Sequence, residues 1–541
     1  GAEFAINNEG RYFALSPDGR NLAFLANAGD VTAVYLRNLA ELETRVLAGT
    51  AGAKSLVWSP DSRRLAWFTS NKLLRIDIEK DSTPVSIADV DPGIGHSASW
   101  GANGQIVYAR ISGEAIYTVS TAGGAAQVLL RADVGQGDAR LTWPSFLPDG
   151  ESLLYLRHGF DGSKELRWYR PQQPVQRVAT LASDARLLPD GTLLYVRDGS
   201  LLSQSFDPVS GSLTGEPRPI ANDVGYFLTT GFAAYSASDN GILAYHGGAQ
   251  TSRLRWFDRN GTAGEVLGND GDYLNLAFSP DGRRLLFDRT QPGPNTYDVW
   301  MLEFGSGGET RVTADKDTEI AGIWLPGTDA IAYSASRAYG PRMHRRDLAS
   351  GVDTPMLADT GFQRPQDVTP DGRTLAYIER AWSGSGQFKA WTVNLDDGQP
   401  PQPLYQSAFQ QTNVRFSPDG RFVAFIANDT GRHELYIAPY PIVGTKVRIS
   451  TDGAWQLRWP RTSGEILYVS ATGKLISVPI KTTPSLEIGP AVEVFALDAR
   501  GWIGYDVTPD GQRLLAIEPR MDRRKSPITL ISGFDRAPKA Q

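Results

Sequence analysis

The 541-residue chain contains no cysteine, and this absence excludes several classes of functional site. Disulfide bonds, thiolate zinc sites, iron–sulfur clusters and cysteine nucleophiles all need that residue. The absence leaves the cellular compartment open, because a chain without thiols tolerates both oxidising and reducing surroundings. We therefore expect no thiol-dependent chemistry, and we expect no cofactor.

Positive charge is not in excess either: 54 Lys and Arg residues stand against 60 Asp and Glu residues, a formal net charge of −6. Nucleic acid binds positively charged surfaces, so it is not an expected partner. No apolar run reaches the roughly 18 residues of a membrane helix, and we expect no secretory leader at the start of the sequence. The sequence thus predicts no membrane span within it.

Catalytic and metal-binding motifs are missing as well. The best match to the Gly-x-Ser-x-Gly elbow of serine hydrolases, at residues 95–99, lacks the final glycine. The five histidines are spread along the chain and never show the His-Glu-x-x-His spacing of a zinc site. We therefore expect no catalytic residue and no metal site.

The sequence does contain many turn-forming residues and a repeat. Its 56 Gly and 34 Pro exceed the average usage of about 7% and 5%. A tetrad of the form Ser/Thr/Leu-Pro-Asp-Gly recurs intact seven times, and five degenerate copies fill the gaps. Successive copies lie 41 to 50 residues apart, which divides the chain into twelve units. The copies end at Gly19, Ser62, Gly104, Gly150, Gly191, Gly241, Gly282, Thr328, Gly372, Gly420, Gly464 and Gly511.

Each tetrad predicts a tight turn between two β-strands. Pro presets the first central turn position, Asp caps the turn with its side chain, and Gly accepts a positive φ. Around Ser279–Gly282, the apolar pairs Ala277-Phe278 and Leu285-Leu286 indicate a hairpin, and third and fourth strands follow near 299–302 and 310–312. Four short antiparallel strands in about 45 residues are typical of a propeller blade. We therefore predict an all-β fold of twelve four-stranded blades with almost no helix.

Twelve blades exceed the usual four to eight of one ring. We therefore expect two six-bladed rings, residues 1–268 and 269–541, the second ending in a short polar tail; one twelve-bladed ring is the alternative. The last unit has strands at 505–507, 513–517 and 528–532 but lacks a fourth. The N-terminal strand at 4–6 is a candidate to complete this twelfth blade and interlock the two halves.

The repeat resembles a known class of sequence. Ser-Pro-Asp-Gly-Arg-x-Leu-Ala-Phe followed by a Leu/Ile-Tyr/Trp strand is similar to the WD40-like (PD40) repeats of TolB-like β-propellers. The order of particular units, such as 143–150, 272–275 and 431–441, is most similar to the C-terminal propeller region of bacterial eukaryotic-like serine/threonine protein kinases.

This resemblance implies a non-catalytic module that binds a ligand or a protein, as the sensory or interaction domain of a bacterial signalling protein such as a serine/threonine kinase. It also implies an extracytoplasmic location, periplasmic or at the cell surface, with a kinase domain and membrane helix upstream; the cytoplasm is the alternative. Two other functions remain open. One is the gating propeller of a prolyl-oligopeptidase-like hydrolase, and the other is a free-standing periplasmic scaffold like TolB.

A binding site is expected on the face that bears the loops leading into the innermost strands. Tryptophans in these loops offer large contact areas at a low entropic cost, and polar side chains accompany them. The expected partner is a small molecule, glycan, peptide or protein. The candidate ligand-binding residues are Trp143, Arg364, Gln366, Trp382, Gln410, Gln411, Asn413, Trp455, Trp502 and Tyr505.

Overall fold

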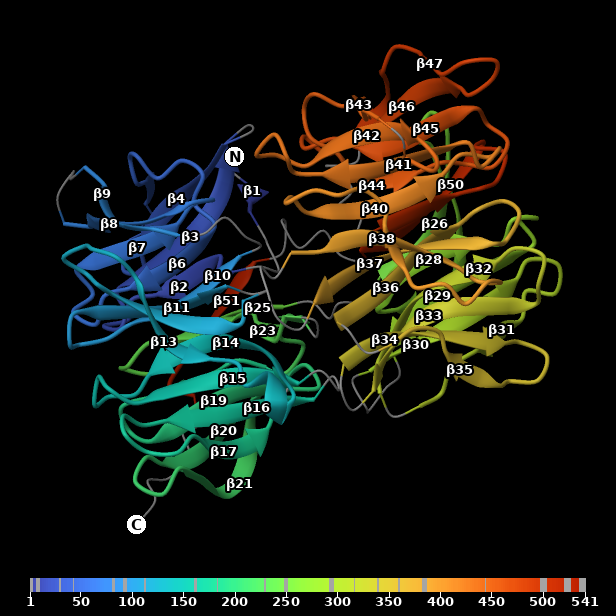
Figure 1. Cartoon of the computed structure of the whole chain (residues 1–541). Helices are drawn as coiled ribbons and strands as arrows, with labels where there is room; N and C mark the ends of the chain where they lie inside the picture. Colours follow the sequence, from blue (N-terminus) through green and yellow to red (C-terminus); the bar gives the residue numbers. More distant parts are fainter. Residues whose placement is uncertain are drawn as a thin grey trace. The chain divides into compact units, whose positions relative to one another are not determined.

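The computed structural model consists almost entirely of antiparallel sheets (Figure 1). Among the described residues the helical structure is one short 3-10 turn, η1 (Val134–Gln136), and no helix has the length and apolarity to cross a bilayer. The structure describes residues 3–5, 10–28, 31–41, 43–79, 83–90, 95–110, 113–159, 163–181, 183–227, 230–247, 252–290, 296–315, 317–337, 340–358, 361–381, 387–442, 444–496, 504–519 and 527–534.

The repeated tetrad forms the turn that its residues predict, as the copy at Ser417–Gly420 shows. The Ser417 hydroxyl donates to the Asp419 carboxylate at 2.6 Å and accepts the backbone N–H of Phe422 at 2.9 Å. The Asp419 carboxylate also accepts the N–H of Arg421 at 3.1 Å, and Gly420 has a φ of +71°. The turn therefore satisfies its own polar groups, which makes each hairpin a locally determined unit.

Two compact units are formed, each with six blades among the described residues. The first propeller contains the described residues up to 247 together with 527–534. Its strands, in chain order by blade, are β1 (Glu3–Phe4), β2 (Phe13–Leu15), β3 (Asn21–Ala28), β4 (Val31–Asn38) and β5 (Thr44–Val46); β6 (Ser55–Trp58), β7 (Arg64–Phe68), β8 (Lys72–Asp77) and β9 (Val85–Asp89); β10 (His96–Trp100), β11 (Gln105–Arg110), β12 (Ala115–Ser120) and β13 (Gln127–Arg131); β14 (Asp138–Phe146), β15 (Leu153–Gly159), β16 (Lys164–Tyr169) and β17 (Gln176–Thr180); β18 (Ala185–Leu187), β19 (Thr192–Arg197), β20 (Ser200–Asp207) and β21 (Ser212–Ala221); the hairpin β22 (Tyr226–Phe227) and β23 (Phe232–Ala233); and β24 (Tyr235–Ala237), β25 (Ile242–His246) and β51 (Ile528–Ser532).

The second propeller contains the described residues from 252 to 519. Its strands by blade are β28 (Tyr273–Phe278), β29 (Arg284–Thr290), β30 (Tyr297–Glu303) and β31 (Glu309–Arg311); β32 (Glu319–Leu325), β33 (Ala330–Arg337), β34 (Gly340–Asp347) and β35 (Asp353–Pro355); β36 (Gly361–Val368), β37 (Thr374–Ala381), β38 (Lys389–Asn394) and β39 (Gln402–Pro403); β40 (Gln411–Phe416), β41 (Phe422–Ala427), β42 (Glu434–Pro439) and β43 (Val447–Arg448); β44 (Trp455–Arg458), β45 (Glu465–Val469), β46 (Lys474–Lys481), β47 (Glu487–Ile488) and β48 (Val492–Ala496); and β49 (Gly504–Val507), β50 (Arg513–Pro519), β26 (Ser252–Asp258) and β27 (Ala263–Gly271).

Each ring closes on itself. The innermost strands of successive blades contact one another, and β49 of blade 12 returns to contact β28 of blade 7. In the first propeller, β2 contacts β24 of blade 6 in the same way. Neighbouring blades are also joined by tryptophan side chains: the indole N–H of Trp58 donates to the Ala14 carbonyl at 2.9 Å, and that of Trp324 to the Ala277 carbonyl at 3.0 Å.

At the closure points, the sixth and twelfth sequence repeats exchange their outer strands. Strand β51, from the C-terminal part of the chain, pairs with β25 over five residues and supplies the third strand of blade 6. Strand β26 pairs with β50 over seven residues and supplies the third strand of blade 12, followed by β27 as the fourth. The second propeller is therefore inserted between β25 and β51 of the first.

This exchange corrects two expectations about domain organisation. The division does not fall at residue 268, because residues 252–271 belong to the second propeller and 527–534 to the first. The N-terminal strand does not complete blade 12, because Glu3 and Phe4 pair with Asn27 and Ala26 of blade 1; residue 6 of that predicted strand lies outside the described residues. Blade 12 already has its fourth strand in β27.

Candidate ligand-binding pocket

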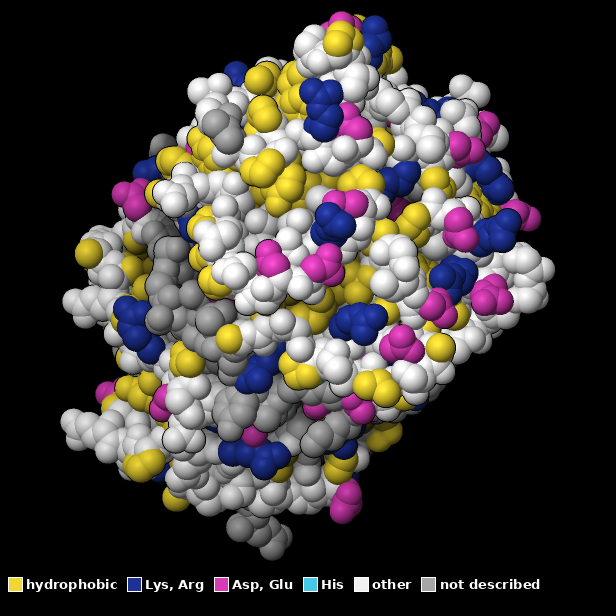
Figure 2. All heavy atoms as spheres, turned by 45° about the vertical axis from the view of Figure 1, so that its right-hand side comes forward, with side chains coloured by type: hydrophobic (Ala, Val, Ile, Leu, Met, Phe, Trp, Pro, Cys, Tyr) yellow, Lys and Arg dark blue, Asp and Glu magenta, His cyan; other side chains and the backbone are white. Residues whose placement is uncertain are grey.

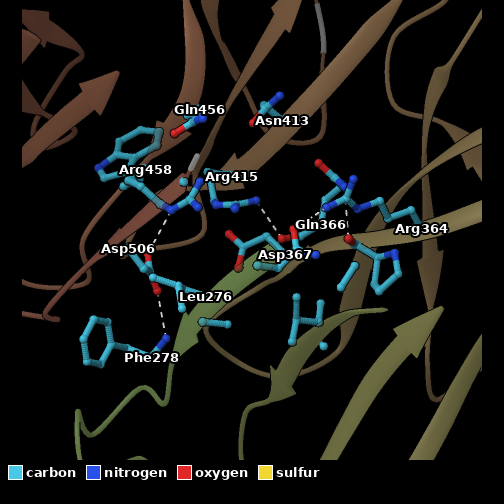
Figure 3. Close-up of a pocket in the computed structure, with 18 of the residues that line it drawn as sticks. Leu276, Phe278, Arg364, Gln366, Asp367, Asn413, Arg415, Gln456, Arg458 and Asp506 are labelled. Carbon is cyan, nitrogen blue, oxygen red and sulfur yellow. Dashed lines mark hydrogen bonds and ion pairs between the residues drawn. The ribbon is translucent and has the colours of Figure 1, made fainter. Parts of the chain in front are cut away.

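A pocket of about 550 Å³ lies within the second propeller, lined by all six of its innermost strands, β28, β32, β36, β40, β44 and β49 (Figure 3). These strands form the rigid wall of the ring, so the side chains that they carry are held in place by the blades behind them. The volume lies within the range of about 300–1,000 Å³ that is typical of small-ligand sites.

Bulges in the innermost strands direct polar side chains at this pocket. The pairing register shifts in β32, β40 and β44, and each shift contains a residue with a positive φ: Ala321 at 60°, Asn413 at 52° and Gln456 at 50°. A bulge bends its strand and changes the direction of the side chains around it. Asn413 and Gln456 both line the pocket as a result.

Four arginines and two aspartates line the pocket, and two of the arginines form ion pairs with the aspartates. Arg458 Nε donates to Asp506 Oδ1 at 2.9 Å, and Arg461 Nη2 donates to Asp367 Oδ1 at 2.9 Å. Arg458 also donates to the Tyr505 carbonyl oxygen at 2.6 Å. These contacts orient both guanidinium groups, and Figure 3 shows the pair of Arg458 with Asp506.

A third arginine, Arg364, is held through an amide. Arg364 Nη2 donates to the side-chain oxygen of Asn275, whose nitrogen donates to Asp288. Asp288 is buried, and it also accepts the backbone N–H of Ala321 at 2.9 Å. Burial raises the pKa of Asp288 to about 6, although the hydrogen bonds and Arg364 act in the opposite direction. Asp288 is therefore mostly ionised at pH 7 and mostly protonated at pH 5.

The fourth arginine, Arg415, has no carboxylate partner within 4 Å among the described residues. Its Nη1 donates to two backbone carbonyl oxygens, those of Gln366 and Val414, both at 2.7 Å. Burial, reinforced by the positive charge of Arg458, lowers the pKa of Arg415 to about 10. The group remains protonated at pH 7, but its charge is less well compensated than that of Arg458 or Arg461.

Aromatic side chains line the pocket near the first residues of the innermost strands. Trp455 begins β44 and is 45% exposed, and its ring lies 4.5 Å from that of His433. Phe362 and Phe388 form an edge-to-face pair at 5.5 Å. Burial lowers the pKa of His433, so this imidazole is neutral at pH 7. The aromatic end is not free of charge, because the Arg380 guanidinium lies over Phe362 at 5.9 Å and over Phe388 at 5.6 Å, but the arginines of β40 and β44 that line the pocket lie further along their strands.

Six of the ten residues singled out in the sequence line this pocket: Arg364, Gln366, Gln410, Asn413, Trp455 and Tyr505. The Tyr505 side chain is only 1% exposed, and its hydroxyl donates to the Gln456 carbonyl at 2.9 Å. The hydroxyl is therefore already engaged within the protein. Arg458 lies over the Tyr505 ring at 5.2 Å.

The other four residues are placed differently. Gln411 is buried inside the blade, where its side chain accepts the N–H of Ala390 at 3.2 Å and donates to the Tyr405 carbonyl at 2.8 Å. Trp143 is not a loop residue: it is buried in β14 and lines a hollow of about 300 Å³ in the first propeller. Its indole N–H donates to the Thr230 carbonyl at 2.7 Å. Trp382 and Trp502 lie outside the described residues.

The sequence reasoning missed the charged residues at the centre of the pocket. Asp367, Arg415 and Asp506 each stand five residues before the end of their tetrad, and Arg458 occupies the same place in its blade one residue earlier. Blades 7 and 8 carry Ala277 and Ile323 there. Comparing this one position across the repeats identifies three charged residues, and Arg458 lies one position before it.

The described side chains on the face drawn in Figure 2 show no such concentration of one sign, because Lys and Arg are interspersed with Asp and Glu there. The pocket of the second propeller therefore differs from this surface, because the fold brings several arginines together in it.

Known proteins resemble the chain only distantly, and no protein-family model matches it. An uncharacterized protein of Agrobacterium fabrum is 24% identical over 261 residues, 48% of this chain and 70% of the relative. Among solved structures, a provisionally assigned TolB of Agrobacterium tumefaciens is 16% identical with a TM-score of 0.41, covering 51% of this chain and all of that one. The tricorn protease is 12% identical with a TM-score of 0.34, covering 96% of this chain and 58% of that one. Likenesses this weak establish no family and no shared activity.

Proposed function

We propose that the chain is a non-catalytic recognition module that binds its ligand in the central pocket of the second propeller. The observation that supports this most directly is the pocket itself, in which a group of aromatic side chains and a group of hydrogen-bonded guanidiniums line one cavity. Binding sites typically combine apolar walls with a few convergent polar groups. Here Trp455 and Phe362 supply the walls, and Arg364, Arg415 and Gln410 supply the polar contacts.

The rigidity of the wall favours binding further. Side chains on closed sheets lose little additional freedom when a ligand arrives, so less of the interaction free energy is spent on ordering them. The ion pairs of Arg458 and Arg461 have the same effect, because they hold the guanidiniums in place before the ligand enters.

We further propose that this module is the extracytoplasmic sensory or interaction domain of a bacterial signalling protein, such as a serine/threonine kinase. The support is the order of its repeat units, above all the segment 431–441, which resembles the propeller region of those kinases. Reading the native gene around the segment that encodes this sequence tests this. A kinase catalytic loop followed by one apolar span supports the proposal, whereas a signal peptide without a kinase contradicts it and favours a free-standing scaffold.

The recognition role is tested by calorimetric titration of the protein with cell-envelope sugars and peptides, in wild type and in Trp455→Ala. The matched control is Val492→Ala, which removes an exposed apolar side chain on the outer strand β48. A ligand whose affinity falls in Trp455→Ala and stays constant in Val492→Ala supports binding at this pocket. Turnover of the ligand, or equal affinity in all three proteins, contradicts it.

A further inference from the structure

We propose that the pocket of the second propeller binds the carboxylate of a small organic anion, with Arg415 as its main cationic contact, and that an apolar group of the same ligand lies at the aromatic end. The inference rests on the proposed function, because it assigns a ligand class to the site described above. It is carried by the charge balance of the pocket, by the hydrogen bonds of Arg415 and by the order of side chains along β44 and β40.

The charge balance leaves the pocket positive. Its lining contains four guanidiniums and two carboxylates, and the two carboxylates form ion pairs with Arg458 and Arg461. Asp288 accepts a hydrogen bond from Asn275, which in turn accepts one from Arg364, and its negative charge offsets part of the charge of Arg364. One to two positive charges therefore remain in a partly dehydrated cavity, where an unpaired charge is costly.

The uncompensated charge is centred on Arg415. Its neighbours of like charge, Arg458 and Arg461, repel it, while Asp367 and Asp506 attract it from beyond ion-pair distance. Its only hydrogen bonds among the described residues use Nη1, and both go to neutral carbonyl oxygens. The guanidinium therefore has donors that remain available for a carboxylate, which matches its fork geometry with two parallel hydrogen bonds.

A second observation also favours an anion in this pocket. Nη1 of Arg461 is buried and has no hydrogen-bond partner among the described residues, although Nη2 of the same group is paired with Asp367. A buried donor without a partner costs free energy, and native structures rarely keep one without a reason. This nitrogen gains an acceptor if the Arg461 side chain shifts toward an oxyanion bound in the pocket.

The size of the residual charge limits the ligand. One carboxylate neutralises the lower value of this residual charge, whereas a polyphosphate would bring several negative charges beside Asp367 and Asp506. The pocket therefore favours a singly charged anion over a polyphosphate.

The order of residues along the strands places the apolar part of the ligand. Trp455 precedes Arg458 in β44 across a bulge, and their pairing partners Val469 and Leu467 lie two positions apart in the neighbouring strand, so about 7 Å separates their backbones along the strand. The Phe362 and Phe388 pair lies at the same end as Trp455, near the start of β36. An arylalkanoic acid, or the C-terminal residue of a peptide, has the length to reach from the aromatic side chains to the arginines.

The experiment is calorimetric titration of the 541-residue protein with two carboxylates and their neutral amides. The free-acid probe is 3-phenylpropionate and the peptide-end probe is N-acetylphenylalanine, each compared with its primary amide; inorganic phosphate is a fifth probe. We expect at least one carboxylate to bind, its amide to bind about tenfold more weakly or worse, and phosphate to bind more weakly than the carboxylate. The two carboxylates distinguish a free acid from a peptide end.

The variant is Arg415→Gln, with Arg283→Gln as the control because Arg283 is an exposed arginine of the same propeller that lies outside the pocket. We expect carboxylate affinity to fall about tenfold or more in Arg415→Gln, to fall less in Arg415→Lys, and to be unchanged in Arg283→Gln. Circular dichroism of each variant checks that the fold is retained, and Arg415→Lys serves as the second variant if Arg415→Gln unfolds.

Equal binding of acid and amide, an unchanged affinity in both Arg415 variants, tighter binding of phosphate, or no binding of either carboxylate overturns the inference. Its failure is distinguishable from failure of the proposed function. A neutral ligand that is lost in Trp455→Ala but retained in Arg415→Gln contradicts the carboxylate assignment and leaves the recognition role standing.

Discussion

Asp506 accepts a hydrogen bond from the backbone N–H of Phe278 at 2.8 Å, although the two residues lie 228 positions apart. Phe278 ends the innermost strand of blade 7 and Asp506 lies in that of blade 12, so the bond joins the last blade of the second propeller to its first. The other carboxylate oxygen of Asp506 binds Arg458. One side chain therefore both closes the ring and orients an arginine of the pocket.

We predict that Asp506→Ala destabilises the second propeller by about 2–4 kcal/mol, because it removes the closing hydrogen bond and leaves Arg458 without its carboxylate. Asp506→Asn keeps an acceptor for the Phe278 N–H and costs less. Chemical denaturation measures both. Asp396→Ala is the control: its weak pair with Arg373 is largely exposed and contributes about 0–1 kcal/mol. Equal stability of Asp506→Ala and this control contradicts the role in closure.

Removing β51 should destabilise the first propeller selectively. Truncation after residue 526 deletes the strand that pairs with Ile242–His246 and also Phe534, which is packed in the core of that unit. The second propeller keeps all of its strands. Calorimetry is expected to show one unfolding transition lowered and the other retained, and truncation after residue 534 is the matched control. A uniform loss of both transitions argues against two separately closed rings.

The protonation of Asp288 should make the stability of the second propeller depend on pH. Its pKa is raised to about 6 in the folded protein, so the folded state binds this proton more tightly than the unfolded state. The associated stability is therefore fully present below about pH 4 and is lost as the pH rises through 6. Denaturation from pH 4 to 7, in wild type and in Asp288→Asn, measures it. An identical pH dependence in the two proteins contradicts the assignment.

Gln411 and Gln410 should respond in opposite ways to substitution. Gln411 bonds Ala390 and Tyr405 within its blade, so Gln411→Ala is expected to cost about 1–3 kcal/mol of stability without a specific effect on ligand affinity. Gln410 lines the pocket, so Gln410→Ala is expected to change affinity with a stability change below about 0.5 kcal/mol. Denaturation and calorimetric titration of both variants check the pair. A destabilised Gln410→Ala with normal affinity would reverse the assignment of roles.

The blades could be predicted from the sequence because their information is local. A tetrad such as Ser417–Gly420 satisfies its hydrogen bonds within a few residues, and its repetition indicates the number of units. The exchange of β26 and β51 could not be predicted in this way. Both segments have the sequence of an ordinary third strand, and which ring each one joins depends on the edges that remain open after the chain has folded.

The pocket was predictable only in part, for a similar reason. Trp455 and Gln410 could be selected because each precedes an innermost strand, as side chains of a binding loop do. Arg415 is surrounded in sequence by Val414 and Phe416 and looks like a strand residue with an outward charge. The bulge that contains Asn413 changes its direction, and neither periodicity nor composition reveals a bulge of that kind.

The insertion of one propeller into the other also sets an order of synthesis. Every described strand of the second propeller lies between residues 252 and 519, so all of them leave the exit tunnel of the ribosome before β51 does. The first propeller begins earlier but must hold β25 as an open sheet edge until residues 528–532 have left the exit tunnel. The half of the protein that is made first is therefore the half that is completed last.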